Sequence, residues 1–149
     1  MAYKETYWAK EGSYIVSMSL LDNRITFILM NLSSEDATEI FNIVLENITR
    51  LKTKFTSITD LSLFKPLDNN VPNVIAEVQA LLAKYDWGCY ARVKQTDEKD
   101  LSLHGVMKDG FFNSFQSAEF YLNEWRKAYS DEEYRDRLIF KEIKKNNDC

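Results

Sequence analysis

The sequence predicts an α/β fold, with a mixed sheet of four or five strands and helices packed mainly on one face. Two observations support this prediction. Short apolar runs typical of strands alternate along the chain with longer stretches in which apolar residues recur every three or four positions, as on one face of a helix. The 149 residues also include only four Gly and two Pro, which favours long regular elements over a turn-dense β-sandwich.

Two strands are predicted within residues 13–32, around a turn at Asp22 and Asn23. The second strand, from Ile25 to Leu32, is apolar on both faces, which is typical of a central strand covered from both sides. Because strands and helices alternate after this pair, we expect its second strand, at 25–32, to lie parallel to the next strand, at 55–61. The further strands are predicted at residues 54–62, 88–94 and 111–113.

The first helix is predicted to follow Ser33 or Ser34, either of which can cap it. Acidic residues occupy its first turn and basic residues gather at its end, in agreement with the helix dipole. Its apolar stripe consists of Ala37, Ile40, Phe41, Val44, Leu45, Ile48 and Leu51. We expect the core to form where this helix and the next one meet the sheet. Its predicted residues are Phe41, Val44, Ile48, Val78 and Leu82, packed against Ile25, Phe27 and Leu29 or their other-face neighbours.

Two more helices show the same period. One begins near Pro72, whose missing N–H costs nothing in a first turn, with Asn69 or Asn70 as its cap. The other begins from a cap at Ser114. Their apolar stripes consist of Val71, Val74, Ile75, Val78, Leu81, Leu82 and Tyr85 in the first, and Ala118, Tyr121, Leu122, Trp125 and Tyr129 in the second.

No linker, repeat or low-complexity tract divides the chain, so we expect a single domain over residues 1–149. Its core is expected over about residues 13–128. A charged helical extension follows at about 130–149, opened by a capping box at Ser130. The stretch 95–110 is ambiguous and allows a short helix around residues 101–107.

Charge and hydropathy indicate where the protein acts. The net charge of −4 and the pI near 5.1 give no electrostatic footprint for nucleic acid. No apolar run approaches the roughly 20 residues that span a bilayer, and the N-terminus lacks the apolar core of a signal peptide. We therefore expect a cytoplasmic protein with no membrane span and no nucleic-acid partner.

The sequence contains no recognised catalytic motif. There is no P-loop, G-x-G-x-x-G or G-x-S-x-G, and the single histidine, His104, has no nucleophile or carboxylate around it in a known pattern. No Cys or His cluster has the spacing of a zinc site. Cys89 is expected to be a free buried thiol, because the alternative, a disulfide with Cys149, would require the end of the chain to dock on the core. We expect a protein that is not an enzyme and has no catalytic residues, metal site or cofactor.

Three segments resemble a known family. They are TDLSLFKPLDNNV at 59–71, WGCYARVK at 87–94 and FFNSFQSAEFYLNEW at 111–125. Together they resemble STAS-type domains, in particular the SpoIIAA-like branch of stand-alone bacterial proteins related to anti-sigma-factor antagonists. The resemblance covers roughly residues 13–128 and implies the same α/β fold and a regulatory role through protein–protein interaction.

The resemblance also places a partner-binding site. In the antagonists a D-S-S-G motif opens the second helix, and its first serine is phosphorylated. Here the motif falls on residues 68–71, which read Asp-Asn-Asn-Val, so that Asn69 occupies the phospho-acceptor position and cannot accept phosphate. The same residues also suit ordinary capping and turn chemistry. The implied partner-binding residues are Phe64, Leu67, Asp68, Asn69, Asn70 and Val71.

Two functions follow as expectations. The first is a non-catalytic regulatory module that acts by protein–protein interaction, without the usual serine phospho-switch. The alternative is a carrier or sensor of a small apolar ligand bound between sheet and helices, since STAS-like relatives can have a cavity there and 13% of this chain is aromatic. A homodimer is a further option for the protein partner.

Overall fold

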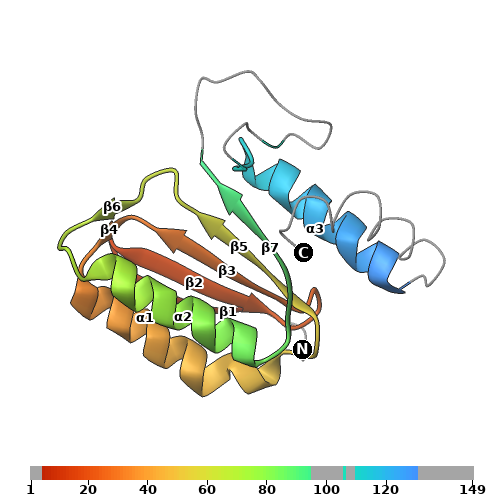
Figure 1. The fold of residues 1–149 in the computed structure, drawn as a ribbon, viewed down its shortest axis with the longest axis horizontal. Helices are drawn as coiled ribbons and strands as arrows, with labels where there is room; N and C mark the ends of the chain where they lie inside the picture. Colours follow the sequence, from red (N-terminus) through yellow and green to blue (C-terminus); the bar gives the residue numbers. More distant parts are fainter. Residues whose placement is uncertain (1–4, 95–105, 107–109, 131–149) are drawn as a thin grey trace.

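The structure is a computed structural model that describes residues 5–94, 106 and 110–130 (Figure 1). The main sheet has the strand order β1-β2-β3-β5-β7. Its strands are β1 (Thr6–Lys10), β2 (Tyr14–Ser19), β3 (Arg24–Leu29), β5 (Phe55–Asp60) and β7 (Trp87–Val93). A small second sheet joins β4 (Asn31–Leu32) to β6 (Lys65–Pro66). The helices are α1 (Ser34–Asn47), the 3-10 turn η1 (Ile48–Arg50), α2 (Val71–Lys84) and α3 (Phe115–Ser130).

The main sheet is mixed, which confirms the predicted fold class. Strands β1, β2 and β3 pair antiparallel, whereas β3, β5 and β7 pair parallel. The expected parallel neighbours are therefore present, with Ile25 opposite Ser57. Strand β1 was not predicted, although Tyr7 and Trp8 are residues that favour strands. The predicted turn is also confirmed, and Asn23 adopts a left-handed φ of 53° within it.

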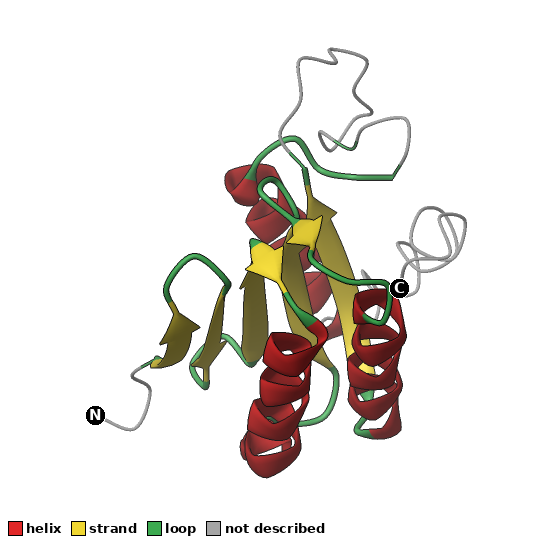
Figure 2. Ribbon diagram, turned by 90° about the vertical axis from the view of Figure 1, so that its left-hand side faces the viewer, coloured by secondary structure: helices red, strands yellow, loops and turns green. Residues whose placement is uncertain are grey.

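The helices form two layers around the sheet (Figure 2). Helices α1 and α2 lie side by side on one face, in agreement with the prediction that helices cover mainly one face. Helix α3 lies on the opposite face, where it packs against β7 and β5. The parallel strands are consequently the part of the sheet that has helices on both sides.

The larger hydrophobic core lies between the sheet and helices α1 and α2. The predicted core residues Val44, Ile48, Val78, Leu82, Ile25, Phe27 and Leu29 are all buried in it. Phe41 is the exception, because it is only partly buried at the edge of this core. Leu45 is likewise 48% exposed. The buried stripe of α1 is narrower than the sequence predicts, because α2 and the sheet cover only part of its circumference.

A second core lies under α3. It is built by Ala118, Tyr121, Leu122 and Trp125 of the helix with Cys89, Ala91, Val93, Ile58 and Phe112. These four residues were predicted for the buried face of the helix, and the side chain of Tyr129, the fifth predicted residue, lies outside the described part of the chain. Burial of Cys89 is also confirmed, but the expected free thiol is wrong, because Cys89 is disulfide-bonded.

The helix starts are largely those expected from capping chemistry. The hydroxyl of Ser33 accepts a hydrogen bond from the N–H of Asp36, and that of Ser114 accepts one from Ser117. Asn70 holds the N-cap position of α2 but makes no side-chain cap bond. Pro72 lies in the first turn of that helix, as predicted.

The carboxylate of Asp36 joins α1 to the unpredicted β1–β2 hairpin. It accepts hydrogen bonds from Lys10 Nζ at 2.6 Å and from Ser13 Oγ at 2.7 Å. The bond from Lys10 holds the pKa of Asp36 below its ordinary value and raises the pKa of Lys10. Tyr14 donates a further bond to Glu39 at 2.9 Å, and burial raises the pKa of Tyr14 to about 12. These contacts fix the edge of the sheet to the first helix.

Strand β7 contains a β-bulge at Gly88. Trp87 pairs with Phe55 and Cys89 pairs with Thr56, so Gly88 has no partner residue on β5. A Cβ atom at Gly88 would lie 2.7 Å from the carbonyl oxygen of Lys54, which is closer than real Cβ contacts. The close approach of Lys54 at the bulge therefore requires a residue without a side chain.

Some predictions differ from the structure or fall outside its described part. Residues 111–113 form no strand, because Phe112 makes only isolated bridges to Val93 and Val106. The predicted helix around 101–107 lies outside the described residues apart from Val106, and the extension over 131–149 lies wholly outside them. Among the helices that the structure describes, none is long and apolar enough to cross a membrane.

Candidate functional site

A cavity of about 520 Å³ lies between the main sheet and helix α2. Strands β3, β5 and β7 supply its floor, α2 supplies one wall, and α1 and the loop after β5 close it further. Most of its lining is apolar: Phe27, Leu29, Leu32, Ala37, Ile40, Leu61, Phe64, Pro72, Ile75, Ala76, Val78, Leu82 and Trp87. The polar residues of the lining are Thr59, Gln79, Tyr90 and Arg92.

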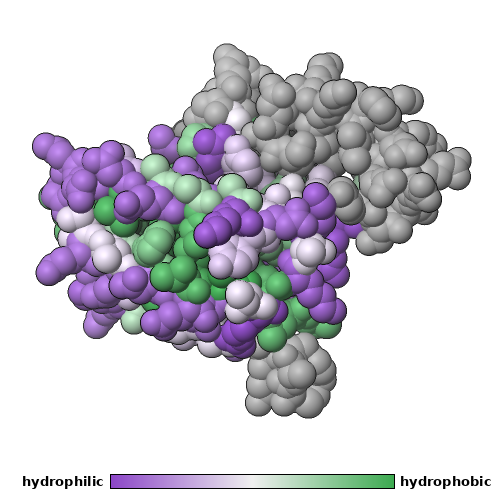
Figure 3. Space-filling model, turned by 60° about the horizontal axis from the view of Figure 1, so that its bottom comes forward, coloured by the Kyte–Doolittle hydropathy of each residue, from purple (hydrophilic) through white to green (hydrophobic). Residues whose placement is uncertain are grey.

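The cavity opens to solvent beside α2. Gln79 and Ala76 line it and are exposed, whereas Val78 and Leu82 line it from the buried face of the same helix. Figure 3 shows hydrophobic residues gathered between hydrophilic borders on the side of the molecule that carries α1 and α2. Exposed residues of α2 therefore border the cavity.

Strand β7 supplies three cavity side chains of mixed character. The indole of Trp87 packs 5.1 Å from the ring of Tyr90, measured between centroids, and donates a hydrogen bond to Ser57 Oγ at 3.0 Å. Arg92 lies two residues beyond Tyr90 and next to Thr59 of β5 in the sheet register. This cationic and aromatic group was not singled out from the sequence. The pattern that could have revealed it is the alternation in residues 87–94, where small apolar residues face α3 and large residues with polar ends face the cavity.

The predicted partner-binding residues do not form one surface. Phe64 is partly buried and lines the cavity. Leu67 is 55% exposed, and Asn69 and Asn70 are exposed. The prediction of Val71 as a partner-binding surface residue is wrong, because this first residue of α2 is fully buried in the main core.

Asp68 joins the two helices at their N-termini. Its carboxylate accepts hydrogen bonds from the N–H of Ser34, at 2.8 Å, and from the N–H of Asn70, at 2.9 Å. The bond from Ser34 is the main cause of the lowered pKa of Asp68. Both bonds satisfy backbone donors that a helix start leaves open. This is the capping and turn role that the sequence allowed for these residues.

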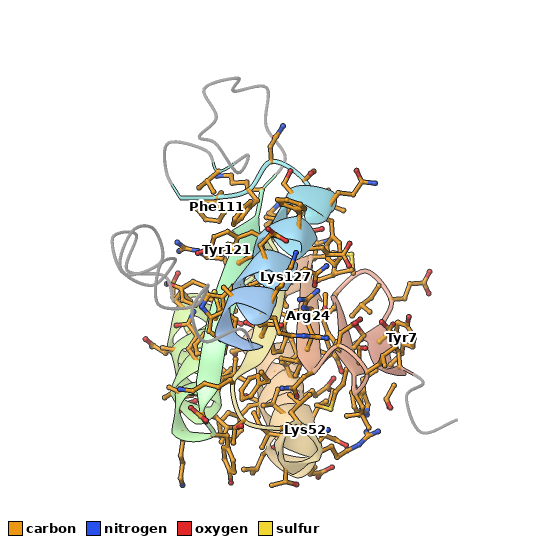
Figure 4. All side chains as sticks on the ribbon, turned by 90° about the vertical axis from the view of Figure 1, so that its right-hand side faces the viewer. Tyr7, Arg24, Lys52, Phe111, Tyr121 and Lys127 are labelled. Atoms are coloured by element: carbon orange, nitrogen blue, oxygen red, sulfur yellow. The ribbon has the colours of Figure 1, made fainter. Side chains whose placement is uncertain are left out.

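A buried arginine lies on the opposite face of the sheet, under α3 (Figure 4). Arg24 donates from Nε to Thr56 Oγ1 at 2.8 Å and from Nη2 to Asn123 Oδ1 at 2.9 Å. Burial lowers its pKa. Because one acceptor belongs to β5 and the other to α3, Arg24 links the helix to the strands.

Only some of the residues considered as catalytic or metal-binding candidates lie in the described part of the chain. His104 lies outside the described residues. Across residues 5–94, 106 and 110–130, no three His, Cys, Asp or Glu side chains are grouped so as to hold a metal ion.

Comparisons with known proteins leave the resemblance to STAS-type domains as a prediction. No family model, curated protein or solved structure matches the chain.

Proposed function

We propose that the protein is a non-catalytic module that binds a small apolar ligand between the sheet and helix α2. The observation that carries this proposal is the cavity of about 520 Å³ with its largely apolar lining. Ligand sites typically have volumes of about 300–1,000 Å³ and apolar walls with a few placed polar groups. The cavity has both properties, so it favours the second of the two functions expected from the sequence.

The energetics support an apolar occupant. Transfer of apolar surface out of water is favourable by about 25 cal/mol per Å². The floor residues Phe27 and Leu29 are held by the sheet, and Trp87 is fixed by its hydrogen bond to Ser57, so the site is formed before a ligand arrives. A preformed site avoids the ordering cost that weakens binding to mobile surfaces.

Blocking the cavity mouth should weaken ligand binding. Ala76 is exposed and lines the cavity, so Ala76→Trp places an indole at the opening without altering the core. We expect the Kd for N-phenyl-1-naphthylamine, a neutral fluorescent probe, to rise about tenfold or more, equivalent to about 1.4 kcal/mol. Fluorescence titration measures this change.

The matched control for this experiment is Ala80→Trp. Ala80 is exposed on the same helix but does not line the cavity, so its indole should leave the Kd within about twofold. Equal Kd values for the wild type and Ala76→Trp would contradict binding in the cavity, as would a wild-type protein that does not bind the probe.

A second candidate function is docking of a regulatory protein partner at the loop after β5. Two large apolar side chains there are exposed, Leu63 by 71% and Leu67 by 55%, next to the cavity residue Phe64. Exposed apolar side chains that gather beside a ligand site are typical of interaction surfaces. Asp68 contributes to this surface indirectly, because it holds the loop against α1.

If a partner docks at this loop, the double variant Leu63→Ser and Leu67→Ser should no longer bind it. A protein that the wild type retains stoichiometrically in a pull-down should be lost by about tenfold or more, because apolar anchors dominate interface energies. Leu21→Ser is the control, since Leu21 is 65% exposed in the turn between β2 and β3. Retention of the partner by the double variant would place the interface elsewhere.

Location and assembly belong to the same proposal. The net charge of −4 supports a protein without a nucleic-acid partner. A cytoplasmic location remains the proposal from the sequence, but the disulfide of Cys89 weighs against it, because disulfides are rare in reducing compartments. A homodimer stays a prediction as well.

A further inference from the structure

Arg92 is the charged residue of the cavity lining. Arg92 extends from β7 into the lining, and its Nε atom is buried. Among the side chains that the structure describes, this Nε is the buried nitrogen that lacks a hydrogen-bond partner. Every other residue that lines the cavity is uncharged.

Aromatic rings and the backbone hold Arg92 in place. Its guanidinium carbon lies 4.9 Å from the ring centroid of Phe111 and 5.6 Å from that of Tyr90. The carbonyl oxygen of Arg92 accepts a hydrogen bond from the N–H of Phe112 at 2.8 Å. Within the described part of the chain, no carboxylate forms an ion pair with Arg92. The rings restrain the guanidinium, but they leave its buried Nε–H without an acceptor.

A buried cationic donor without an acceptor is unfavourable by itself. A buried group that loses its hydrogen-bond partner forfeits its hydration without compensation, and the loss is larger for a charged group. A ligand oxygen that carries negative charge would supply both the acceptor and the counter-charge. The planar fork of arginine suits a carboxylate, which can accept two parallel N–H bonds.

We propose that the ligand is an amphipathic monocarboxylate, with its carboxylate on Arg92 and its apolar chain along β3, β5 and α2. This inference rests on the proposed ligand-binding function and adds the chemical class of the ligand. The single charge of the lining matches the single charge of a carboxylate. A phosphate monoester carries about −1.5 to −2 at neutral pH and would be left partly uncompensated.

The test compares decanoate with decan-1-ol, two probes with the same apolar chain and different head groups. Calorimetric titration below the micelle concentration gives the Kd of each for the full chain and for Arg92→Gln. We expect Arg92→Gln to weaken decanoate binding by about 10- to 100-fold, the range for a hydrogen bond to a charged group. Binding of decan-1-ol should stay within about twofold.

Two further variants sharpen the result. Arg92→Lys keeps the charge but lacks the fork and Nε, so its decanoate affinity should lie between those of the wild type and Arg92→Gln. Arg50→Gln removes an exposed arginine that does not line the cavity, and it should bind decanoate as the wild type does. Circular dichroism verifies that each variant is folded.

The outcomes separate this inference from the proposed function. If Arg92→Gln binds decanoate as tightly as the wild type does, the assignment of the head group is overturned while the apolar cavity stands. A decan-1-ol affinity that equals the decanoate affinity in the wild type has the same meaning. If the wild type binds neither probe, the ligand-binding function itself is overturned.

Discussion

The Phe55→Ala variant is expected to lose about 3–5 kcal/mol of unfolding free energy, the usual cost of deleting a buried aromatic ring. Phe55 is 1% exposed and is the largest of the fully buried side chains in the described part of the molecule. It stands at the start of β5, where its ring fills the main core beneath α1 and α2. Urea denaturation at equilibrium measures the loss, which is a large share of a small domain's stability.

Phe41→Ala provides the comparison. Phe41 also contacts the main core, but it lies partly exposed on α1, so less apolar surface returns to water when its ring is removed. We expect a smaller loss than for Phe55→Ala. Equal losses for the two variants would contradict the deeper burial of Phe55.

Gly88→Ala is expected to destabilise the protein by about 1–3 kcal/mol or more, the cost of inserting atoms where none fit. The new methyl group would meet the Lys54 carbonyl oxygen at 2.7 Å, the Lys54 carbonyl carbon at 2.8 Å and Trp125 Cη2 at 2.6 Å. A side-chain tip can move, but the Lys54 backbone is fixed by its hydrogen bond to Asp86. The midpoint of urea unfolding reports the effect.

A double variant separates the two contacts at Gly88. Trp125→Phe removes the atom at 2.6 Å and leaves the contacts with Lys54 in place. Gly88→Ala should therefore cost less in the Trp125→Phe background than in the wild type, but the cost should not vanish. A Gly88→Ala protein as stable as the wild type would contradict the close approach of β7 to Lys54.

Elements with a strong period and clear caps could be predicted from the sequence. Ser33 and Ser114 start α1 and α3 as predicted, because a hydroxyl before an apolar stripe satisfies helix donors locally. The parallel pairing of β3 with β5 followed from the alternation of strands and helices. Strand β1 was missed because its pattern is weak: it is an edge strand, and its five residues are exposed or only partly buried.

The candidate site could be predicted only in part. Pro72 marked the start of α2, but of the residues that the resemblance implied between Phe64 and Val71 only Phe64 lines the cavity. The role of Asp68 depends on Ser34, 34 residues earlier in the chain, and no local pattern shows such a contact. Arg92 depends in the same way on side chains from β5, α2 and residue 111. Tertiary contacts of this kind become visible only when the strands are placed side by side.

The bulge at Gly88 also gives the two faces of the sheet separate optical reporters. One extra residue shifts the alternation of β7, so that Trp87 shares the cavity with Tyr90 and Arg92 instead of facing α3. Trp125, buried on the other side of the sheet, reports on how α3 packs against the strands. Trp8, the third tryptophan, packs against the main core from β1. In a Trp8→Phe background, intrinsic fluorescence can thus distinguish events at the cavity from the detachment of α3 without an added label, because the bulge leaves one indole on each side.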